Sequence, residues 1–350
     1  MTLTLVQKKA IAIGAGVAVL AGGAFFVLRS DSPVAKSIRK VAGEDPTCPL
    51  TGAEPKNDKV IDRPAIAVKI ENNPDARPLS GLEKAEIVYE ELVEGGFTRF
   101  VAIYHCTDTG KAGPIRSSRV VDPAIVLPYT RILAAGRGND IVQKVLDEAE
   151  LVMVDETAAG DAMRREERPG ISSEHTLYGD TVAIRKLGQK SFEDAPSELY
   201  EFGDLEGKAK PAKTVKVTFS GASDIEYRWM GGSYKRFEAD GTPFTAESGD
   251  QIEVDNLLIE EHEIDLSKTI TDSVGTPSTE ISDVAGTGRA VLFRDGKAIR
   301  GKWRRESAEV PVEFVTKAGE TMVFKPGTIW IELVPSQKGD VKGSFSYAKR

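Results

Sequence analysis

The stretch Glu90–His105 reads "EELVEGGFTRFVAIYH", in which two apolar segments meet at Gly95 and Gly96. Apolar segments on both sides of a Gly-Gly pair are typical of a β-hairpin with a short turn. Five of the sixteen residues can carry a charge near neutral pH: three glutamates, an arginine and a histidine. Side chains alternate between the two faces of a strand, so the pairing register decides which of these groups face the core.

A two-residue turn at Gly95 and Gly96 predicts that Glu90, Glu94 and Arg99 share one face and form a cross-strand ion pair. Glu91 is then the single charge on the other face, among the residues Ile87, Tyr89, Val93, Thr98, Phe100, Ala102 and Tyr104. Burial raises the pKa of such a carboxyl unless a cation reaches it, and enzymes prepare general acids in this way. A three-residue turn would shift the pairing by one residue, and this alternative stays open.

Outward from the hairpin, the apolar patterns predict an α+β protein with two domains. Residues 63–190 form a mixed α/β domain, with expected strands at 65–70, 86–92, 97–105, 131–136 and 150–154 and helices at 138–150 and 179–190. Asn139 or Asp140 is the expected cap of the first helix, and Asp180 that of the second. Residues 214–337 form a mainly β domain with a hairpin turn at Asp295 and Gly296. The remaining segments are a tether at 31–62, a linker at 191–213 and a tail at 338–350, and we also expect a long loop at 265–283.

Near the N-terminus, "IAIGAGVAVLAGGAFFVL" (Ile11–Leu28) is eighteen residues long and carries no charge. This length is just enough for a helix to span a bilayer. We expect residues 1–30 to form a short cytoplasmic stub and a transmembrane signal anchor, with a cleaved secretory peptide as the alternative. Lys8 and Lys9 place the stub inside, so the sequence predicts a single-pass protein of the cell membrane with most of the chain extracytoplasmic. Lipoprotein processing would need a cysteine directly after the apolar run, and the first cysteine is Cys48.

The net charge of the chain limits the classes of molecule that its surface can bind. The residues after position 30 carry 43 basic and 54 acidic side chains, a net charge of −11. This balance excludes nucleic acid as a partner for the whole surface, so any anion site has to be a local cluster. The membrane, contacted through the N-terminal helix, is the one partner that the sequence predicts directly.

The chain has two cysteines, Cys48 and Cys106. A disulfide between them is the expected state in an exported chain, and two separate thiols are the alternative. No closely spaced histidine or cysteine set accompanies them, so we expect neither a metal site nor another cofactor.

The segment "GPIRSSR" (Gly113–Arg119) places Arg116 and Arg119 beside two serines. Arginine forks and hydroxyl groups are suitable donors to a phosphate or carboxylate, and Arg77 could add a third cation. The alternative is that each arginine pairs with one of the protein's own carboxylates.

A second loop, "SSEHTLYGD" (Ser172–Asp180), contains Glu174 and His175. His175 is a candidate general base or ligand, with a hydrogen-bonded structural histidine as the alternative. We expect His105 and His262 to be structural or solvated. The sequence lacks a nucleophile elbow, a Walker loop, a dinucleotide fingerprint and an HExxH motif, which removes the commonest enzyme classes.

Five segments together resemble one family, the YerB-like bacterial envelope proteins. They are "RPAIAVKIENNPDARPLSGLEKAEIVYEELVEGGFTRFVAIYH", "GPIRSSR", "EHTLYGD", "GTGRAVLFRDGKAIRGKW" and "GTIWIELVP", and the resemblance runs from about Cys48 to Pro335. It implies a membrane-attached extracytoplasmic protein of two domains without an established activity. The motif positions that it marks are Asn72, Arg77, Ser80, Glu91, Glu94, Arg99, Arg116, Arg119 and His175.

Three features of the chain depart from the family pattern. Members are commonly lipoproteins, whereas this chain has an apolar run of anchor length. Leu79 replaces the glutamine that usually follows "ARP", and Thr176 replaces the asparagine that usually follows the motif histidine. These two replacements remove side-chain amides that a polar network could have used.

Three functional hypotheses follow. The first is a binding protein with an arginine-rich cleft that holds an anionic glycan, peptide or protein partner, using Asn72, Arg77, Ser80, Glu94, Arg99, Arg116 and Arg119. The second is a hydrolase of envelope polymers in which Glu91 or Glu94 acts as acid or base and His175 assists. The third is a structural protein whose charges scatter over the surface. The sequence leaves open whether the protein is an enzyme.

Overall fold

The computed structural model describes residues 18–21, 24–27, 45–205, 207, 209–272 and 274–349. The chain divides into two units, Met1–Pro46 and Thr47–Arg350. In the first unit, Ala18–Ala21 (β1) and Ala24–Val27 (β2) pair as antiparallel strands. The rest of the predicted membrane anchor lies outside the described residues. No helix in the described part of the chain has the length and apolar character needed to cross a membrane, so the anchor stays a prediction.

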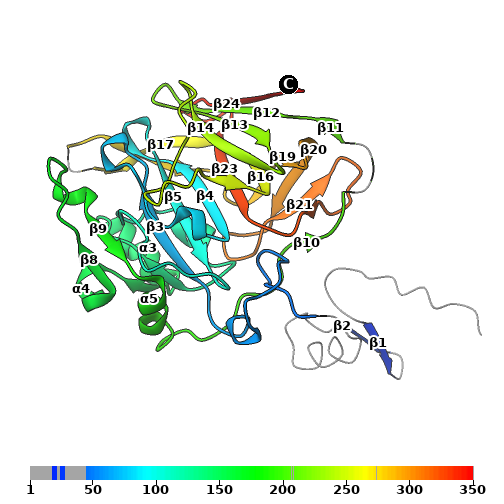
Figure 1. Ribbon diagram of the computed structural model, residues 1–350, viewed down its shortest axis with the longest axis horizontal. Helices are drawn as coiled ribbons and strands as arrows, with labels where there is room; N and C mark the ends of the chain where they lie inside the picture. The colour runs from blue at the N-terminus through cyan, green and yellow to red at the C-terminus, as the bar shows by residue number, and fades with distance from the viewer. Residues whose placement is uncertain are drawn as a thin grey trace, which may run out of the picture. The chain divides into compact units, whose positions relative to one another are not determined.

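One 11-stranded sheet crosses both predicted domains of the second unit (Figure 1). The first domain contributes five strands: Ile66–Glu71 (β3), Ile87–Leu92 (β4), Thr98–Tyr104 (β5), Ile132–Ala134 (β6) and Val152–Val154 (β7). The later part of the chain contributes six: Lys210–Pro211 (β11), Asn256–His262 (β16), Gly286–Arg294 (β19), Lys297–Arg305 (β20), Glu313–Thr316 (β21) and Ile329–Pro335 (β23). The order is β11-β20-β19-β16-β23-β4-β5-β3-β6-β7, and β21 pairs with β20. The halves meet where β23 pairs in parallel with β4.

A second, five-stranded sheet has the order β15-β14-β13-β12-β24. Its strands are Glu253–Val254 (β15), Ser233–Glu238 (β14), Ser223–Met230 (β13), Thr214–Ser220 (β12) and Ser344–Ala348 (β24). Apolar side chains of this sheet pack in one core with β3, β4 and β5. Four short pairings complete the strand set: Ile264–Thr271 (β17) with Pro277–Ile281 (β18), Met163–Arg165 (β8) with Leu177–Gly179 (β9), and Glu201–Phe202 (β10) with Val323–Phe324 (β22), besides β1 with β2.

Within the described residues, the α-helices all belong to the first domain. They are Asp122–Val126 (α2), Asp140–Glu148 (α3), Glu156–Ala159 (α4) and Thr181–Gly188 (α5). Asn139 caps α3 by accepting a hydrogen bond from the Val142 backbone N–H, and Asp180 caps α5 in the same way, which confirms two of the predicted caps. In Figure 1, α3, α4 and α5 gather near β3, β8 and β9, away from the strands of the later part of the chain.

The β4–β5 hairpin differs from its prediction by one residue. Leu92 pairs with Thr98 and Glu91 pairs with Arg99. The connection therefore runs from Val93 to Phe97 and is longer than the predicted two-residue turn at Gly95 and Gly96. Gly95 and Gly96 have φ values of 71° and 79°, a conformation that favours glycine. The alternative turn left open by the sequence is therefore the one that forms. As a result, Glu90 shares a face with Phe100, while Glu91 and Arg99 share the other.

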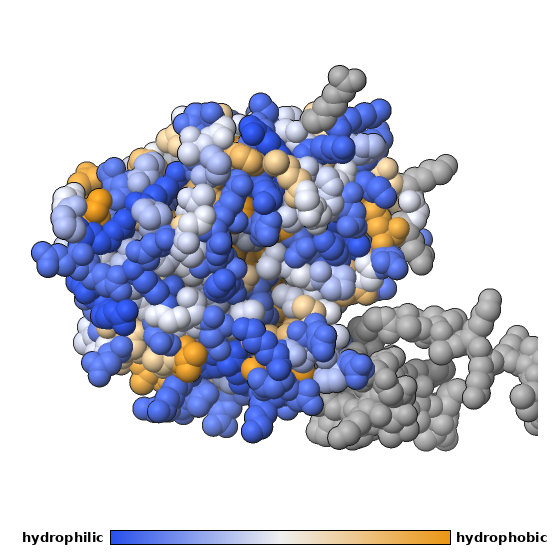
Figure 2. All heavy atoms as spheres, viewed as in Figure 1, coloured by the Kyte–Doolittle hydropathy of each residue, from blue (hydrophilic) through white to orange (hydrophobic). Residues whose placement is uncertain are grey.

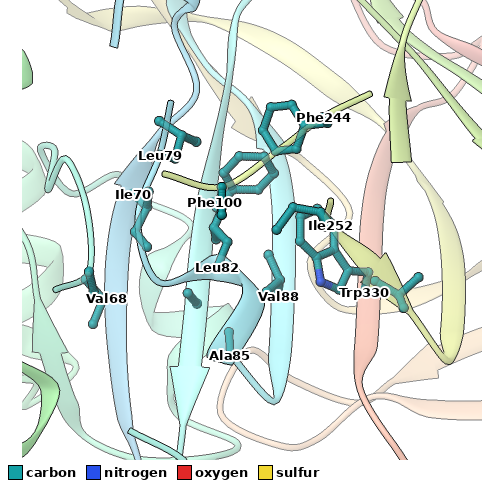
Figure 3. Close-up of a cluster of buried hydrophobic side chains, with 14 of the residues drawn as sticks. Val68, Ile70, Leu79, Leu82, Ala85, Val88, Phe100, Phe244, Ile252 and Trp330 are labelled. Atoms are coloured by element: carbon teal, nitrogen blue, oxygen red, sulfur yellow. The ribbon is translucent and has the colours of Figure 1, made fainter. Parts of the chain in front are cut away.

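The core lies on both faces of the large sheet. Figure 3 shows Phe100 of β5 and Trp330 of β23 in one cluster with Phe244 and Ile252, so residues far apart in the sequence pack together. The ring centroids of Phe100 and Trp330 are 5.3 Å apart. On the opposite face, α2 and α3 cover a second cluster. On the outside, Figure 2 shows mainly hydrophilic residues on the visible face, with apolar residues in small separate groups.

Cys48 and Cys106 form the predicted disulfide, with their Cα atoms 6.1 Å apart. The bond ties the start of the second unit to the residues that follow β5. Its loop spans a sequence separation of 58 residues, for which the chain-entropy account gives a stabilisation of about 4 kcal/mol.

Three segments predicted to lack regular structure contain strands. The linker at 191–213 holds β10 and β11, and β11 is an edge of the large sheet. The tail at 338–350 holds β24, which pairs with β12. The loop at 265–283 holds the β17–β18 hairpin. The strands β10, β11 and β24 obtain their hydrogen bonds from partners far away in the sequence, which local composition does not reveal.

The Asp295–Gly296 turn was predicted correctly. Both residues have positive φ, 52° and 66°, as a two-residue hairpin turn of this kind requires.

Candidate functional site

Charged residues line one end of β4, β5 and β3 on a single face of the large sheet. Glu91 of β4 is opposite Arg99 of β5, and Arg99 is opposite Glu71 of β3. Lys69, two residues before Glu71, lies on the same face and is fully buried. The period of two along each strand brings these four groups together.

Lys69 supplies the cation that the sequence could not assign to Glu91. Its Nζ forms ion pairs with Glu91 and with Asp122, the latter at 2.5 Å. Burial raises the pKa of Glu91, although the Lys69 charge opposes this shift. Among the described residues, Oε2 of Glu91 has no hydrogen-bond partner. Glu91 is therefore paired on one oxygen only.

The segment that carries Arg116 and Arg119 packs against this row. The backbone N–H of Arg119 donates to Oδ2 of Asp122 at 2.7 Å, and its Nη2 donates to Oε2 of Glu94 at 2.5 Å. Burial alone would raise the pKa of Glu94, but the Arg119 charge and hydrogen bonds from Arg119 and Ser278 lower it to about 2. Glu94 is consequently ionised at neutral pH.

Glu71 receives two groups from distant segments. Nε of Arg116 lies 2.5 Å from Oε2 of Glu71, and Nδ1 of His175 lies 3.3 Å from the same oxygen. Arg116 also pairs with Glu174 at 3.2 Å. His175 is buried and contacts Glu71 rather than Glu91.

Arg99 differs from the other arginines of this group. It is 7 % exposed, and among the described residues it forms no ion pair with a carboxylate. Its Nη1 donates to the Ser117 carbonyl at 3.0 Å, and its Nε has no partner in the described part of the chain. Burial, together with the charges of Arg119 and Arg116, lowers the pKa of Arg99 to about 10. Arg99 thus stays charged at neutral pH.

We call the group formed by these residues the arginine cluster: Lys69, Glu71, Glu91, Glu94, Arg99, Arg116, Arg119, Asp122 and His175. The hairpin, "GPIRSSR" and "SSEHTLYGD" meet in it, so the hypothesis of scattered charges is wrong. Arg116 and Arg119 nevertheless pair with the protein's own carboxylates, which is the alternative that the sequence left open for these two arginines. The predicted ion pair of Glu90 and Glu94 with Arg99 is wrong, because the register places Glu90 on the opposite face.

On that opposite face, Glu90 joins the two parts of the chain. Its carboxylate forms an ion pair with Arg236 of β14, and the two side chains are 1 % and 0 % exposed. Oε1 of Glu90 also accepts hydrogen bonds from Asn72 at 3.1 Å and Thr98 at 2.6 Å. The Arg236 guanidinium lies 4.5 Å from the Phe244 ring centroid. We call this set, with Glu332, the interdomain cluster.

Glu332 lies beside Glu90 in the β23–β4 pairing and is fully buried. Burial and the Glu90 carboxylate raise the pKa of Glu332 well above its usual range. Tyr227 donates a hydrogen bond to it. The raised pKa favours the neutral form of Glu332 beside the Glu90–Arg236 pair.

The structure places three residues of the predicted ligand set away from the arginine cluster. Asn72 bonds to Glu90, as described above. Arg77 forms an ion pair with Glu238 at 2.8 Å and donates to Oδ1 of Asn72 at 3.0 Å. Ser80 donates to Glu247 at 2.7 Å. The contacts of Arg77 with Glu238 and of Ser80 with Glu247 connect the first domain to the later part of the chain.

Sequence reasoning missed Lys69, Asp122 and Arg236. The signal for Lys69 was a lone lysine in the apolar run "AIAVKI", since a buried lysine needs a carboxylate partner. Asp122 and Arg236 carried no comparable signal, because their partners lie 53 and 146 residues away in the sequence.

One group of residue types that could hold a metal occurs in the described part of the chain: Glu86, His105 and Cys106. Cys106 is in the disulfide, so its sulfur is not available as a thiolate ligand. Burial lowers the pKa of His105 to about 4. This group is structural.

Two small pockets lie beside the arginine cluster. The first is lined by Glu91, Leu92, Arg119, Val121, Ile264, Thr279 and Ile281. The second shares Val121 and Ile281 with it and reaches Tyr89, Glu260, His262 and Trp303. Thr279 donates to the Leu92 carbonyl at 2.6 Å, so the β17–β18 hairpin is attached where the first pocket lies.

His262 lines the second pocket and is buried, not solvated. Its Nδ1 is 3.0 Å from Asp283, its Nε2 is 3.2 Å from Glu260, and its ring stacks on Trp303 with centroids 4.5 Å apart. Burial alone would lower the pKa of His262, but the hydrogen bonds with Asp283 and Glu260 raise it to about 9. His262 is therefore an imidazolium at neutral pH.

These features define a class of two-part α+β proteins whose halves share one sheet and whose charged groups meet on both of its faces. Residues 50–194 match the "Protein of unknown function (DUF3048) N-terminal domain", and residues 215–331 match the "Protein of unknown function (DUF3048) C-terminal domain". The chain belongs to this YerB-like two-domain family.

Two comparisons give the degree of similarity. The chain is 29 % identical over 309 residues to "Putative lipoprotein YerB" of Bacillus subtilis (strain 168), covering 82 % of this chain and 86 % of the relative. The crystal structure of the Bacillus subtilis YerB protein matches with a TM-score of 0.70 and 26 % identity, covering 86 % of this chain and 99 % of that one.

The interdomain cluster leads to a stability prediction. Replacing Arg236 by Met leaves Glu90 buried without its cation, so we expect the free energy of unfolding to fall by about 3–5 kcal/mol. Arg228→Met is the matched control, because Arg228 is on the neighbouring strand with a side chain that is 40 % exposed and pairs with Glu226. Urea unfolding of both variants measures the difference. Equal effects would contradict the role given to Arg236.

His262 leads to a pH prediction. Its pKa is about 9 in the folded protein and about 6.5 in the unfolded chain, so its contribution to stability is complete below pH 6.5 and is lost as the pH rises through 9. We expect the difference in unfolding free energy between the wild type and His262→Gln to shrink between pH 6.5 and 9.5. Urea unfolding at a series of pH values measures it, and a constant difference would contradict the assigned charge.

Proposed function

We propose that this protein is a membrane-attached extracytoplasmic protein of the cell envelope that binds an anionic ligand through the arginine cluster. The ligand is an anionic glycan, a peptide carboxylate or an anionic patch of a protein partner. One observation carries the binding proposal: Arg99 is a buried guanidinium without a carboxylate partner among the described residues.

The location rests on three observations. The curated relative carries the name of a lipoprotein. The disulfide is of a kind that persists in oxidising compartments outside the cytoplasm. Because Cys48 and Cys106 are joined, neither sulfur is free to carry a lipid, and the apolar run Ile11–Leu28 is the proposed single-pass attachment.

The electrostatics around Arg99 favour an anion. Arg99 is buried, and the carboxylates of Glu71 and Glu94 act on its charge without forming an ion pair with it. Its Nε lacks an acceptor in the described part of the chain, and a bound phosphate or carboxylate would supply one. Arg116 and Arg119 are close enough to shift the pKa of Arg99, so three guanidinium groups act on the same region. Arginine forks bind carboxylate and phosphate with two parallel hydrogen bonds, which gives both affinity and orientation.

A hydrolase of envelope polymers is the second candidate, and Glu91 is the residue that favours it. Its raised pKa and its unpartnered oxygen beside the first pocket suit a general acid. Glu94, with a pKa of about 2, is ionised and only weakly basic, which makes it a poor candidate for either acid or base. The position of His175 against Glu71 argues against a direct partnership with Glu91.

The binding proposal predicts a specific loss on changing Arg99. We expect the full chain in detergent micelles to bind polyglutamate or polyphosphate, and Arg99→Gln to weaken that binding at least about tenfold, as expected for a lost charge-assisted bond. Arg137→Gln is the matched control, because the Arg137 side chain is 67 % exposed and the charge change is the same. Isothermal titration calorimetry measures both variants after thermal unfolding has confirmed that they fold.

An equal loss in the two variants would show binding by general charge and would contradict the site. The variant Arg99→Lys keeps the positive charge but removes the guanidinium fork. We expect it to bind more tightly than Arg99→Gln and less tightly than the wild type. Release of reducing ends from envelope glycan by the wild type but not by Glu91→Gln would favour the hydrolase.

A further inference from the structure

The second pocket has the features of a ligand site distinct from the arginine cluster. Its polar lining consists of Tyr89, Glu260, His262 and Arg305, and its apolar lining includes Ile281 and Leu333. It lies between the β16–β23–β4 part of the sheet and the segments that hold α2 and β18. No residue of the predicted ligand-binding set lines it.

The lining of this pocket includes an acceptor that lacks a donor. Glu260 is 1 % exposed, and Oε2 of its carboxylate pairs with the His262 ring. Oε1 of the same carboxylate has no hydrogen-bond partner among the described residues. A buried carboxylate oxygen in this position favours a ligand that brings an N–H or O–H group.

The charges around the pocket balance. The His262 imidazolium lies between Glu260 and Asp283, and Arg305 adds a second positive charge. Two cations thus accompany two carboxylates. A charged ligand would lose its hydration on entering the pocket and would find no unpaired opposite charge there. The balance of charges therefore favours a neutral ligand group.

Arg305 is fixed at the wall of the pocket by backbone carbonyls. Its Nε donates to Val310 at 2.7 Å, and its Nη2 donates to Ala124 at 2.7 Å and to Ala308. These contacts hold the guanidinium plane in place. A guanidinium held in this way can also donate to a carbonyl of the ligand.

The size of the pocket limits the ligand to a small substituent. About 30 Å³ is open to the centres of water-sized groups, where one water needs about 10–15 Å³. The pocket therefore takes two or three non-hydrogen groups, and the rest of any ligand has to lie across its mouth.

We propose that the second pocket binds the acetamido group of an N-acetylated amino sugar in an envelope glycan. The carbonyl and methyl groups enter the pocket, where the carbonyl accepts from Arg305 and the methyl packs between Ile281 and Leu333. The amide nitrogen stays at the mouth, where its N–H donates to Oε1 of Glu260. The choice of a glycan over an acetylated peptide rests on the extracytoplasmic location proposed above. The acetamido site itself is independent of the arginine cluster.

The test uses chitotetraose, a neutral N-acetylglucosamine tetramer, with the full chain in detergent micelles. Cellotetraose has the same backbone without acetamido groups, and an acetyl-lysine peptide carries the acetamido group on another scaffold. Isothermal titration calorimetry compares the three probes. We expect chitotetraose to bind at least about tenfold more tightly than cellotetraose and the peptide.

Two variants locate the binding. In Glu260→Gln, the amide oxygen accepts from His262 and the NH₂ group faces the pocket, so an acceptor becomes a donor and we expect at least about tenfold weaker binding. In Val284→Trp, a larger side chain at a partly exposed lining residue fills the pocket, and we expect binding to be lost. Glu261→Gln is the matched control, because Glu261 pairs with Arg289 and does not line the pocket, and we expect a change below about twofold.

Absence of chitotetraose binding, equal binding of cellotetraose, or unchanged binding in folded Glu260→Gln and Val284→Trp would each overturn the proposal. Binding of the acetyl-lysine peptide alone would overturn the glycan assignment. None of these results depends on Arg99, so failure here and failure of the anion site are distinguishable.

Discussion

The ion pair between Glu90 and Arg236 is the constraint on which the rest of the structure depends. Glu90 stands on a central strand of the sheet, and Arg236 reaches it from the five-stranded sheet, 146 residues away in the sequence. Both side chains are buried, so neither charge has water as an alternative partner. The pair therefore fixes how the sheets face one another, and the β4–β23 pairing next to it makes two sequence domains one unit.

The hairpin register connects this constraint to the candidate site. With Glu90 directed to the five-stranded sheet, the alternation along β4 directs Glu91 to the opposite face, where Lys69, Arg99 and the Arg116–Asp122 segment lie. A shift of one residue would exchange Glu90 and Glu91, leaving Arg236 and Lys69 each without its carboxylate. The same register thus stabilises the fold and forms the arginine cluster.

Local patterns predicted the five strands β3 to β7 of the first domain but not β8 and β9. They also predicted the caps of α3 and α5, the Asp295–Gly296 turn and the disulfide, because each depends on neighbouring residues or on a count of two cysteines. The hairpin register was predicted wrongly, since a Gly-Gly pair permits turns of two lengths. The sheet shared by both domains and the strands β10, β11 and β24 could not be predicted, because their partners lie far away in the sequence. For the site, motif resemblance marked Arg99, Arg116 and Arg119 correctly as neighbours but not the partners Lys69, Glu71 and Asp122.

The central claim is that both predicted domains unfold as one cooperative unit. All three tryptophans, Trp229, Trp303 and Trp330, lie in the later half, so tryptophan fluorescence reports that half. Trp330 also packs on Phe100 and reports the contact with the first half. Hydrogen exchange detected by mass spectrometry on peptides from β3 and β6 reports the first half. In a urea series on the full chain, we predict that both probes give the same midpoint and the same free energy of unfolding. Loss of protection in β3 and β6 at a urea concentration where the tryptophans remain native would contradict the account.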